Sequence, residues 1–319
     1  MTETPISVVI VNYNAGALLT ASVRAVLTSS VPVEVTVVDN ASVDRSLAML
    51  RAMVGDDPRL RVLENRSNVG FAAANNRVLR AVGATYILLL NPDCEVRTDT
   101  LERVWQAMER APEAGIAGCL VRDPDGAEQV ACRRSIPTPW RSLNRVLGLN
   151  RLFPRDPRFQ SFEQSHQPLP TEPVYLEGIS GAFMFVRRAA MDDVGLLDEG
   201  YFLHCEDLDW FMRFRHAGWR ILFVPDAEVV HTKGACSTGS PVRVLWYKHR
   251  GMTRFFCSRP HLRLLMLKLG GIEHAVTGLN WKPARHRPVR SVADSCPNSQ
   301  TPFSVIKERA WVRFRHCAN

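Results

Sequence analysis

Several sequence patterns that are common in secreted and membrane proteins are missing from this chain. Its eight cysteines form no C-x-x-C pair, which disfavours a disulfide framework and a structural zinc site. No apolar run approaches the roughly 18 residues of a membrane span. No positively charged segment precedes the first apolar run, so we expect no secretory signal. These absences predict a soluble chain with reduced thiols, located in the cytoplasm or at the inner face of the cell membrane.

Two glycine-rich nucleotide-binding motifs are also missing. The first apolar run is followed by Asn12–Gly16, which does not supply the G-x-G-x-x-G loop of dinucleotide-binding proteins. No Walker motif occurs anywhere in the chain. A dehydrogenase and a P-loop nucleotidase are therefore disfavoured.

Acidic residues are scarce in the last quarter of the chain. Residues 233–319 contain 16 Lys and Arg but only 3 Asp and Glu, a net charge of +13, while the whole chain carries +8. Val242–Phe256 and Leu262–Leu269 combine basic, aromatic and apolar residues in patterns typical of helices that lie on an anionic membrane surface. Residues 283–319 show no periodicity, so we expect a poorly ordered tail. No nucleic acid partner is expected, because the basic tail contains no recognised binding module.

Apolar runs alternate with segments of helical periodicity in the first part of the chain, which predicts an α/β fold. Parallel strands joined by right-handed helical crossovers are the usual result of this alternation. Residues 133–173 are rich in proline and basic residues, which indicates a long flexible loop over the site or an insertion that faces the acceptor. The predicted strands are Ile6–Val11, Val33–Val38, Leu60–Leu63, Tyr86–Leu90, Ser180–Val186, Arg220–Val224 and Ala227–His231, and the clearest predicted helices are Ala72–Val82 and Thr100–Arg110.

Two of the predicted strands deliver a carboxylate to the edge of the sheet. Asn91-Pro92 stops the run Tyr86–Leu90, because proline removes a ladder donor. Asp93 therefore lies at the carboxyl end of a central strand, and Asp39 ends an earlier one, where ligands bind in open α/β sheets. Asp93 suits a divalent cation bound to phosphates and Asp39 suits a ribose or base edge. A simple turn at Asn91 and Asp93 is the structural alternative.

Three further segments contain candidate site residues, each with a structural alternative. Asn68 and Gly70 open a helix and could lie beside a nucleotide, or form a glycine turn capped by asparagine. Glu206 and Asp207 begin another helix, with Asp207 the first candidate for a general base and Glu206 the second; acids there also offset the helix dipole. His231 leaves a strand into a loop and could complete a metal site with a distant carboxylate, or be structural.

Together these motifs resemble family 2 glycosyltransferases of the GT-A fold, and most closely the bacterial rhamnosyltransferase-like branch. The resembling segments follow the family's order from Ile6 to Phe256. They are SVVIVNYN (Ser7–Asn14), VVDNAS (Val37–Ser42), NVGFAAANN (Asn68–Asn76), LLLNPD (Leu88–Asp93), SGAFMFVRR (Ser180–Arg188), HCEDLDW (His204–Trp210) and VVHTKGACS (Val229–Ser237).

The resemblance implies transfer of a sugar from a nucleoside diphosphate donor with inversion at the anomeric carbon. It implies that Asp93 and His231 bind Mg²⁺ or Mn²⁺, and that Asp207, with Glu206 second, deprotonates the acceptor hydroxyl. The residues it implies for nucleotide binding are Val11, Asn12, Tyr13, Asp39, Asn68, Gly70 and Asn91. The family's D-x-D motif is here Asn91-Pro92-Asp93, so an amide replaces its first acid.

The leading expectation is a metal-dependent enzyme that moves a deoxyhexose, rhamnose from its thymidine diphosphate donor, onto a glycan or polyprenol-linked acceptor in cell-surface polysaccharide synthesis. One alternative is a nucleotidyltransferase that makes the sugar nucleotide, although Asn12–Gly16 lacks the Gly-rich, Arg-bearing loop of such enzymes. The other is a non-catalytic glycan-binding relative. The expected domains are a GT-A domain at 1–240, with a nucleotide-binding half at 1–125 and an acceptor and catalytic half at 126–240, then a basic amphipathic helical region at 241–282 and a tail at 283–319.

Overall fold

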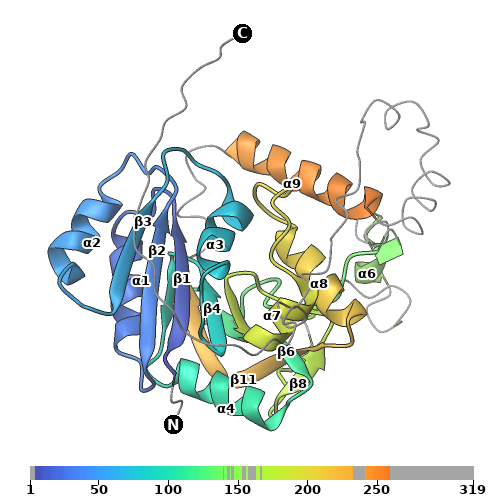
Figure 1. The fold of residues 1–319 in the computed structure, drawn as a ribbon. Helices are drawn as coiled ribbons and strands as arrows, with labels where there is room; N and C mark the ends of the chain where they lie inside the picture. Colours follow the sequence, from blue (N-terminus) through green and yellow to red (C-terminus); the bar gives the residue numbers. More distant parts are fainter. Residues whose placement is uncertain are drawn as a thin grey trace, which may run out of the picture. The chain divides into compact units, whose positions relative to one another are not determined.

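The structure is a computed structural model that describes residues 4–138, 140–141, 144, 147–152, 156, 163–165, 167–232 and 241–258. The helix predicted at Leu262–Leu269 and the tail at 283–319 lie outside these residues. In the described part, strands and helices alternate around one central sheet (Figure 1). The domain boundaries expected after residues 125, 240 and 282 stay predictions.

Four parallel strands form the N-terminal half of the sheet, in the order β3-β2-β1-β4. Every residue of β1 and β4 is buried, as their unbroken apolar runs predict for strands covered on both faces. The strand order reverses between β1 and β4, which makes this the switch point where ligands bind in open sheets. These elements are β1 (Ile6–Asn12), α1 (Ala17–Leu27), β2 (Val33–Asp39), α2 (Ser46–Val54), β3 (Leu60–Glu64), α3 (Phe71–Leu79) and β4 (Tyr86–Leu90).

The second half of the sheet is mixed. Strand β10 lies antiparallel between β4 and β6, and β11 runs parallel to β6 and antiparallel to both β5 and β8. The prediction of a mainly parallel sheet flanked by helices is confirmed, with β10 as the antiparallel strand in its middle. The elements are β5 (Cys94–Val96), α4 (Thr100–Arg110), β6 (Ala114–Arg122), β7 (Arg133–Arg134), α6 (Leu149–Leu152), β8 (Val174–Leu176), β9 (Gly178–Ile179), β10 (Phe183–Arg187), α7 (Arg188–Val194), α8 (Glu206–His216) and β11 (Arg220–His231).

Strand β6 is central, yet the sequence analysis did not predict it. Its residues include two glycines that close packing requires. A Cβ at Gly115 would lie 2.8 Å from the ring of Phe214, and one at Gly118 would lie 2.8 Å from Ile179. Glycine has low strand propensity, so the requirement for small residues hides the strand from pattern analysis.

Two predicted element boundaries were wrong. Arg220–Val224 and Ala227–His231 are not two strands but one, β11, whose register against β6 shifts between Val224 and Glu228 where Pro225 interrupts the ladder. The strand predicted at Ser180–Val186 is found as β10, and two short strands that were not predicted, β8 and β9, precede it. Helix α3 ends at Leu79, three residues before the predicted end.

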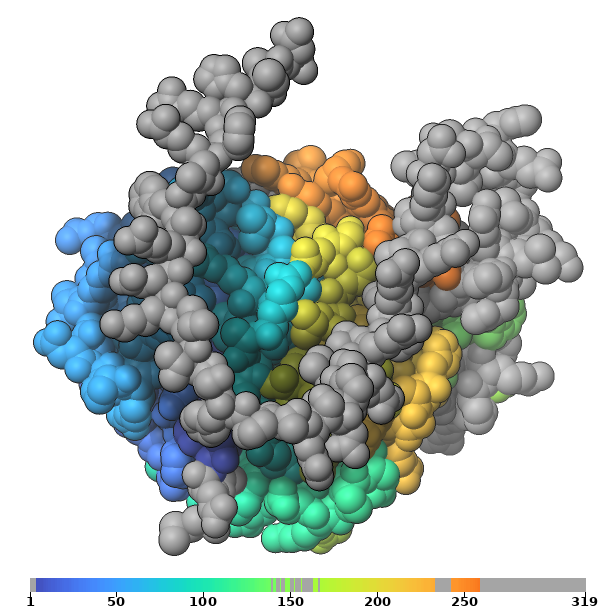
Figure 2. Space-filling model, viewed as in Figure 1, coloured from blue at the N-terminus to red at the C-terminus, as the bar shows by residue number. Residues whose placement is uncertain are grey.

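The last described helix, α9 (Pro241–Cys257), packs on the loop that precedes α8. The rings of Phe202 and Tyr247 stack with centroids 4.3 Å apart, and a Cβ at Gly251 would lie 2.7 Å from the carbonyl oxygen of His204. In Figure 2 the orange atoms of α9 border the yellow atoms of the chain around residue 200. Among the described residues, no helix is both long enough and apolar enough to cross a membrane.

Candidate active site

The carboxyl ends of β1 and β2 hold a hydrogen-bonded group of polar side chains. Asn12 and Asp39 are register partners, and Nδ2 of Asn12 donates to Oδ1 of Asp39 over 2.7 Å. Ser42 donates to the same carboxylate twice, from its hydroxyl at 2.6 Å and from its backbone N–H at 3.0 Å. Asp39 is 3% exposed, so these bonds hold its carboxylate in one orientation at the edge of the sheet. Val11 is buried within β1, and Tyr13 is exposed just beyond it.

Asn68 and Gly70 form a glycine turn that lies between the loop after β2 and the loop before α8. Oδ1 of Asn68 accepts a hydrogen bond from the backbone nitrogen of Gly70 over 3.0 Å, which is the capped turn that the structural alternative describes. Gly70 has φ 87°, and a Cβ there would lie 2.6 Å from the carbonyl oxygen of Phe202. Nδ2 of Asn40 donates to the Gly70 carbonyl over 3.2 Å, so the turn remains next to the Asp39 edge.

The turn after β4 is tied to the loop before β10. The backbone nitrogen of Asn91 donates to the carbonyl oxygen of Ala182 over 2.9 Å, and the thiol of Cys94 lies 3.7 Å from the same oxygen. The backbone of the Asn91–Cys94 turn is therefore fixed relative to strand β10. Asn91 itself is half-buried.

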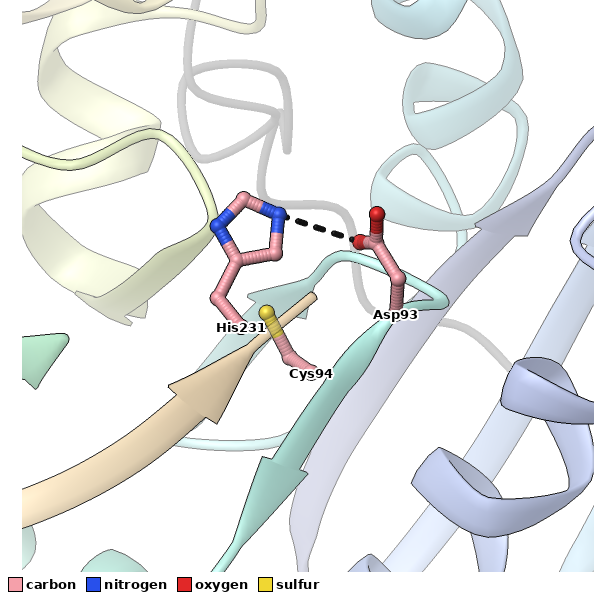
Figure 3. A group of neighbouring side chains, drawn as sticks. All are labelled: Asp93, Cys94 and His231. Carbon is pink, nitrogen blue, oxygen red and sulfur yellow. Dashed lines mark ion pairs between the residues drawn. The ribbon is translucent and has the colours of Figure 1, made fainter. Parts of the chain in front are cut away.

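Asp93 and His231 meet side by side, as predicted (Figure 3). Oδ1 of Asp93 lies 3.1 Å from Nε2 of His231, and both residues are less than a tenth exposed. The pairing of β5 with β11 explains the contact, because His231 is the register partner of Cys94 and Thr232 donates its backbone N–H to the Asp93 carbonyl over 2.9 Å. A carboxylate oxygen and an imidazole nitrogen in this arrangement suit a divalent cation.

Two neighbours of this pair were missed by the sequence analysis. Cys94 places its sulfur with the ligand atoms of Asp93 and His231, all within 4.8 Å of one another. Gln129 places Oε1 2.7 Å from Nδ1 of His231. A residue 102 positions away in the chain has no local pattern that could have identified it.

Asp207 lies in the first turn of α8, where it pairs with Arg134 of β7. Nη2 of Arg134 donates to Oδ2 of Asp207, while Oδ1 accepts from the backbone nitrogen of Leu208 over 2.8 Å. Nε of Arg134 also donates to the carbonyl oxygen of Ile179 over 2.6 Å, which fixes the guanidinium against β9. The sequence analysis grouped Arg134 with the basic residues of the 133–173 loop and gave it no role.

Glu206 precedes Asp207 and differs from it in environment. It is 6% exposed, and one of its carboxylate oxygens has no hydrogen-bond partner. Burial, with the charge of Asp207 as the second cause, raises the pKa of Glu206 to about 8. Glu206 therefore keeps its proton near neutral pH, which leaves Asp207 as the first candidate for the base.

One loop connects the Asp93 side of the site with the Asp207 side. Ala182 accepts the backbone hydrogen bond from Asn91, and a Cβ on its neighbour Gly181 would lie 2.8 Å from Oδ2 of Asp207. The candidate base and the candidate metal ligands thus face one short segment. Such an arrangement can hold a polar leaving group on one side and deprotonate an incoming hydroxyl on the other.

Known proteins resemble this chain over most of its described length. A family model described as glycosyl transferase family 2 matches residues 7–193. The N-acetylglucosaminyl-diphospho-decaprenol L-rhamnosyltransferase of Mycobacterium tuberculosis is 31% identical over 264 residues, which cover 79% of this chain and 84% of the relative. Rhamnosyltransferase WbbL of Escherichia coli is 27% identical over 172 residues, covering 52% of this chain and 59% of the relative.

A solved structure with a similar fold is the mannosyltransferase PcManGT from Pyrobaculum calidifontis in complex with GDP-Man and Mn²⁺. It has a TM-score of 0.51 and 18% identity, over 73% of this chain and 58% of that one. At this identity the likeness establishes the fold alone. The fold predicted from the sequence is confirmed.

Proposed function

Because the chain belongs to glycosyl transferase family 2, we propose that it transfers a deoxyhexose from a nucleoside diphosphate donor to a hydroxyl of a polyprenol-linked glycan, with inversion at the anomeric carbon. The rhamnosyltransferase names of two relatives favour rhamnose as the sugar, and the decaprenol in one of those names favours a lipid-linked acceptor. Thymidine diphosphate is the expected donor nucleotide. Family membership disfavours the nucleotidyltransferase alternative.

The carboxyl edge of β1 and β2 is the proposed site of the nucleoside. The Asp39 carboxylate, fixed by Asn12 and Ser42, has lone pairs left to accept hydrogen bonds from a base or ribose. Val11, Tyr13, Asn68, Gly70 and Asn91 lie on this edge or on the turns beside it and complete the proposed set. A prearranged carboxylate of this kind needs little reordering when the donor binds.

Asp93 and His231 are the proposed ligands of Mg²⁺ or Mn²⁺. The donor set fits such an ion, because a carboxylate oxygen and an imidazole nitrogen converge in a buried position at the end of the sheet. When bound, the ion stabilises the charge that develops on the diphosphate as the bond to the sugar breaks. The amide at Asn91, where the family has an acid, gives this site one negative charge fewer.

Asp207 is the proposed general base, and the observation that supports the whole proposal most strongly is its place in the site. Asp207 is paired with Arg134 and lies against Gly181, and the neighbouring Ala182 is hydrogen-bonded to the turn that carries Asp93. A base on the face of the sugar opposite the diphosphate gives a single displacement, and hence inversion. Glu206 lies buried beside Asp207 and keeps its proton near neutral pH, so we propose Asp207 and not Glu206 as the base.

Helix α9 supports the proposal that the acceptor is reached at an anionic membrane surface. Val242, Leu245 and Trp246 are 80%, 53% and 54% exposed and share one face of the helix. Residues 241–258 contain four Lys and Arg and no Asp or Glu. An apolar stripe flanked by positive charge suits the interface of a bilayer with anionic lipid. The proposed location is accordingly the inner face of the cell membrane.

Calorimetric titration with thymidine, uridine and guanosine diphosphates, each with and without Mn²⁺, tests the donor site. We expect thymidine diphosphate to bind best, to bind more tightly with Mn²⁺, and to lose the Mn²⁺ effect in Asp93→Ala. Asp207→Asn should bind the nucleotide as the wild type does, yet fail to transfer sugar to a glycan linked to polyprenyl diphosphate. If no nucleoside diphosphate binds, the non-catalytic glycan-binding alternative becomes the better one.

A further inference from the structure

Gln129 is a buried glutamine in the turn after β6 whose side chain reaches His231 at the end of β11. It is 3% exposed. Its backbone is anchored at both ends, since its nitrogen donates to the Val121 carbonyl and its carbonyl oxygen accepts from Cys132, each over 2.9 Å. The turn after β6 therefore holds this side chain in a defined position beside the end of β11.

The hydrogen bonds of the Gln129 amide fix which atom faces the histidine ring. Its Nε2 donates to Oδ1 of Asp123 over 2.6 Å and to the backbone carbonyl oxygen of His231 over 3.2 Å. Both of these partners can only accept, so the NH₂ group must point toward them. Oε1 is then the atom 2.7 Å from Nδ1 of His231.

This arrangement determines the tautomer of His231. A carbonyl oxygen cannot donate, so Nδ1 must carry a hydrogen and donate it to Oε1 of Gln129. In the neutral ring the lone pair then lies on Nε2, the atom 3.1 Å from Oδ1 of Asp93. Two lone pairs that face one another repel, and a cation between them turns both atoms into ligands.

We propose that Gln129 is the positioning residue of the metal site: it fixes His231 in the Nδ1–H tautomer and aims Nε2 at the ion that Asp93 shares. The inference rests on the proposed function for the presence of that ion. Asp123 extends the chain of hydrogen bonds by one residue, because it holds the Gln129 amide in its required orientation. Outer partners of this type are worth about 10- to 100-fold in metal affinity.

The tautomer can be measured directly, without metal or substrate. Long-range ¹H–¹⁵N correlation spectra of the metal-free protein, recorded above the usual pKa of imidazole, separate the two tautomers of each ring, and His231→Gln identifies the signal. We expect the Nδ1–H form of His231 in the wild type and a mixture in Gln129→Met. An Nε2–H form in the wild type, or an unchanged signal in Gln129→Met, overturns the proposal.

Asp123→Asn is a second variant that avoids any change of the buried glutamine. An asparagine amide can donate to Oε1 of Gln129, which lets the Gln129 amide turn over and present its NH₂ group to His231. We expect His231 to become a mixture of tautomers in this variant too. Because Asp123 is partly exposed, this variant keeps the test available if Gln129→Met does not fold.

Calorimetric titration with Mn²⁺ gives the second readout. We expect about 10- to 100-fold weaker Mn²⁺ binding in Gln129→Met, with an unchanged circular dichroism spectrum. Gln164→Met is the matched control, since Gln164 also donates from Nε2, to Ser135 over 2.8 Å, but does not contact His231. Equal Mn²⁺ affinity in Gln129→Met and Gln164→Met contradicts the positioning role. If the wild type binds no Mn²⁺, the metal part of the proposed function fails, and the tautomer measurement still decides the role of Gln129.

Discussion

The backbone nitrogen of Phe71 donates a 2.8 Å hydrogen bond to the carbonyl oxygen of Phe202. This bond joins the start of α3, on the nucleotide side of the site, to the loop that leads into α8 and Asp207. Gly70 permits the contact, because any side chain there would meet the same carbonyl oxygen. The two halves of the site are therefore held together by main chain as well as by side chains.

Gly70→Ala should destabilise the protein and separate these halves. Gly70 has φ 87° and ψ 170°, a region that only glycine adopts at low cost, and the new Cβ would lie 2.6 Å from the Phe202 carbonyl oxygen. Strain and overpacking together predict a loss of about 2–5 kcal/mol in the free energy of unfolding. Urea denaturation measures it.

Gly83→Ala is the matched control for this substitution. A Cβ at Gly83 meets no atom within 4 Å, and its φ is not positive. We expect a change of at most about 0.5 kcal/mol. Equal stability of the two variants would show that the loop at Phe202 moves freely away from α3.

Arg134→Gln should weaken the fold around the proposed base. Arg134 and Asp207 are 16% and 12% exposed in their side chains, so the substitution leaves a nearly buried carboxylate without its cation. Breaking a buried pair in this way costs about 3–5 kcal/mol, and the partial exposure favours the lower end. The double variant Arg134→Gln/Asp207→Asn should lose less than Arg134→Gln alone, because no unpaired charge remains.

The control for Arg134 is an exposed pair of the same kind. Arg188 pairs with Asp192 one helical turn away over 2.8 Å, with side chains 30% and 58% exposed. Arg188→Gln should cost about 0.5 kcal/mol or less. If Arg134→Gln and Arg188→Gln unfold at the same urea concentration, the buried Arg134–Asp207 pair contributes no more to the free energy of unfolding than the exposed pair does.

Glu206 should make the protein less stable as the pH rises. Its pKa is raised in the folded protein to about 8 from its usual 4.5, first by burial and then by the charge of Asp207. The folded state therefore holds a proton that the unfolded state releases between about pH 4.5 and 8, so this group lowers the free energy of unfolding progressively across that window. Glu206→Gln should remove this part of the slope, and its advantage over the wild type should grow from pH 5 to pH 8.

Glu34→Gln makes the same chemical change at an exposed position of β2. It removes an exposed carboxyl group instead of a buried one and therefore serves as the control for the loss of one negative charge. Denaturation at several pH values compares the three proteins. Parallel curves for the wild type and Glu206→Gln would contradict the raised pKa.

The sequence predicted the parts of the site that local patterns encode. Asp39 and Asp93 follow apolar runs, and a run that ends in a polar residue places that residue at the edge of the sheet. His231 also ends a strand, and the resemblance implied that it lies near Asp93. The pairing of β5 with β11 that brings the two together was not predicted. The predicted strands Ile6–Val11 and Val33–Val38 agree with the structure to within one residue, because they are rich in β-branched residues.

Arg134 and Gln129 could not be found in the same way. Each contacts a site residue far along the chain, 73 and 102 positions away, and each lies in a short turn or bridge with no periodicity. Their roles follow from donor and acceptor geometry, which exists only once β6, β7 and β11 are assembled. Residues that orient a reactive group are commonly hidden from sequence patterns for this reason.

Negative charges on the exposed face of α9 should weaken the binding of the protein to an anionic bilayer. Leu245→Glu/Trp246→Glu replaces two exposed apolar side chains and adds two negative charges beside Arg250, which lies 5.3 Å from the Trp246 ring. The lost apolar burial and the opposed charge should each cost about 1 kcal/mol or more per residue, so vesicle binding should fall at least tenfold. Co-sedimentation with phosphatidylglycerol vesicles measures it.

Val43→Glu separates this effect from a general change in charge, because Val43 is 90% exposed on the loop after β2. It should bind the same vesicles nearly as the wild type does, and no variant should bind pure phosphatidylcholine.

Phe202 stacks on Tyr247, so α9 contacts the loop before Asp207, and a docked helix would hold the base next to the lipid surface. If the α9 variant sediments with anionic vesicles as well as Val43→Glu does, the acceptor must reach Asp207 without help from this face, and the membrane part of the proposed function should be abandoned.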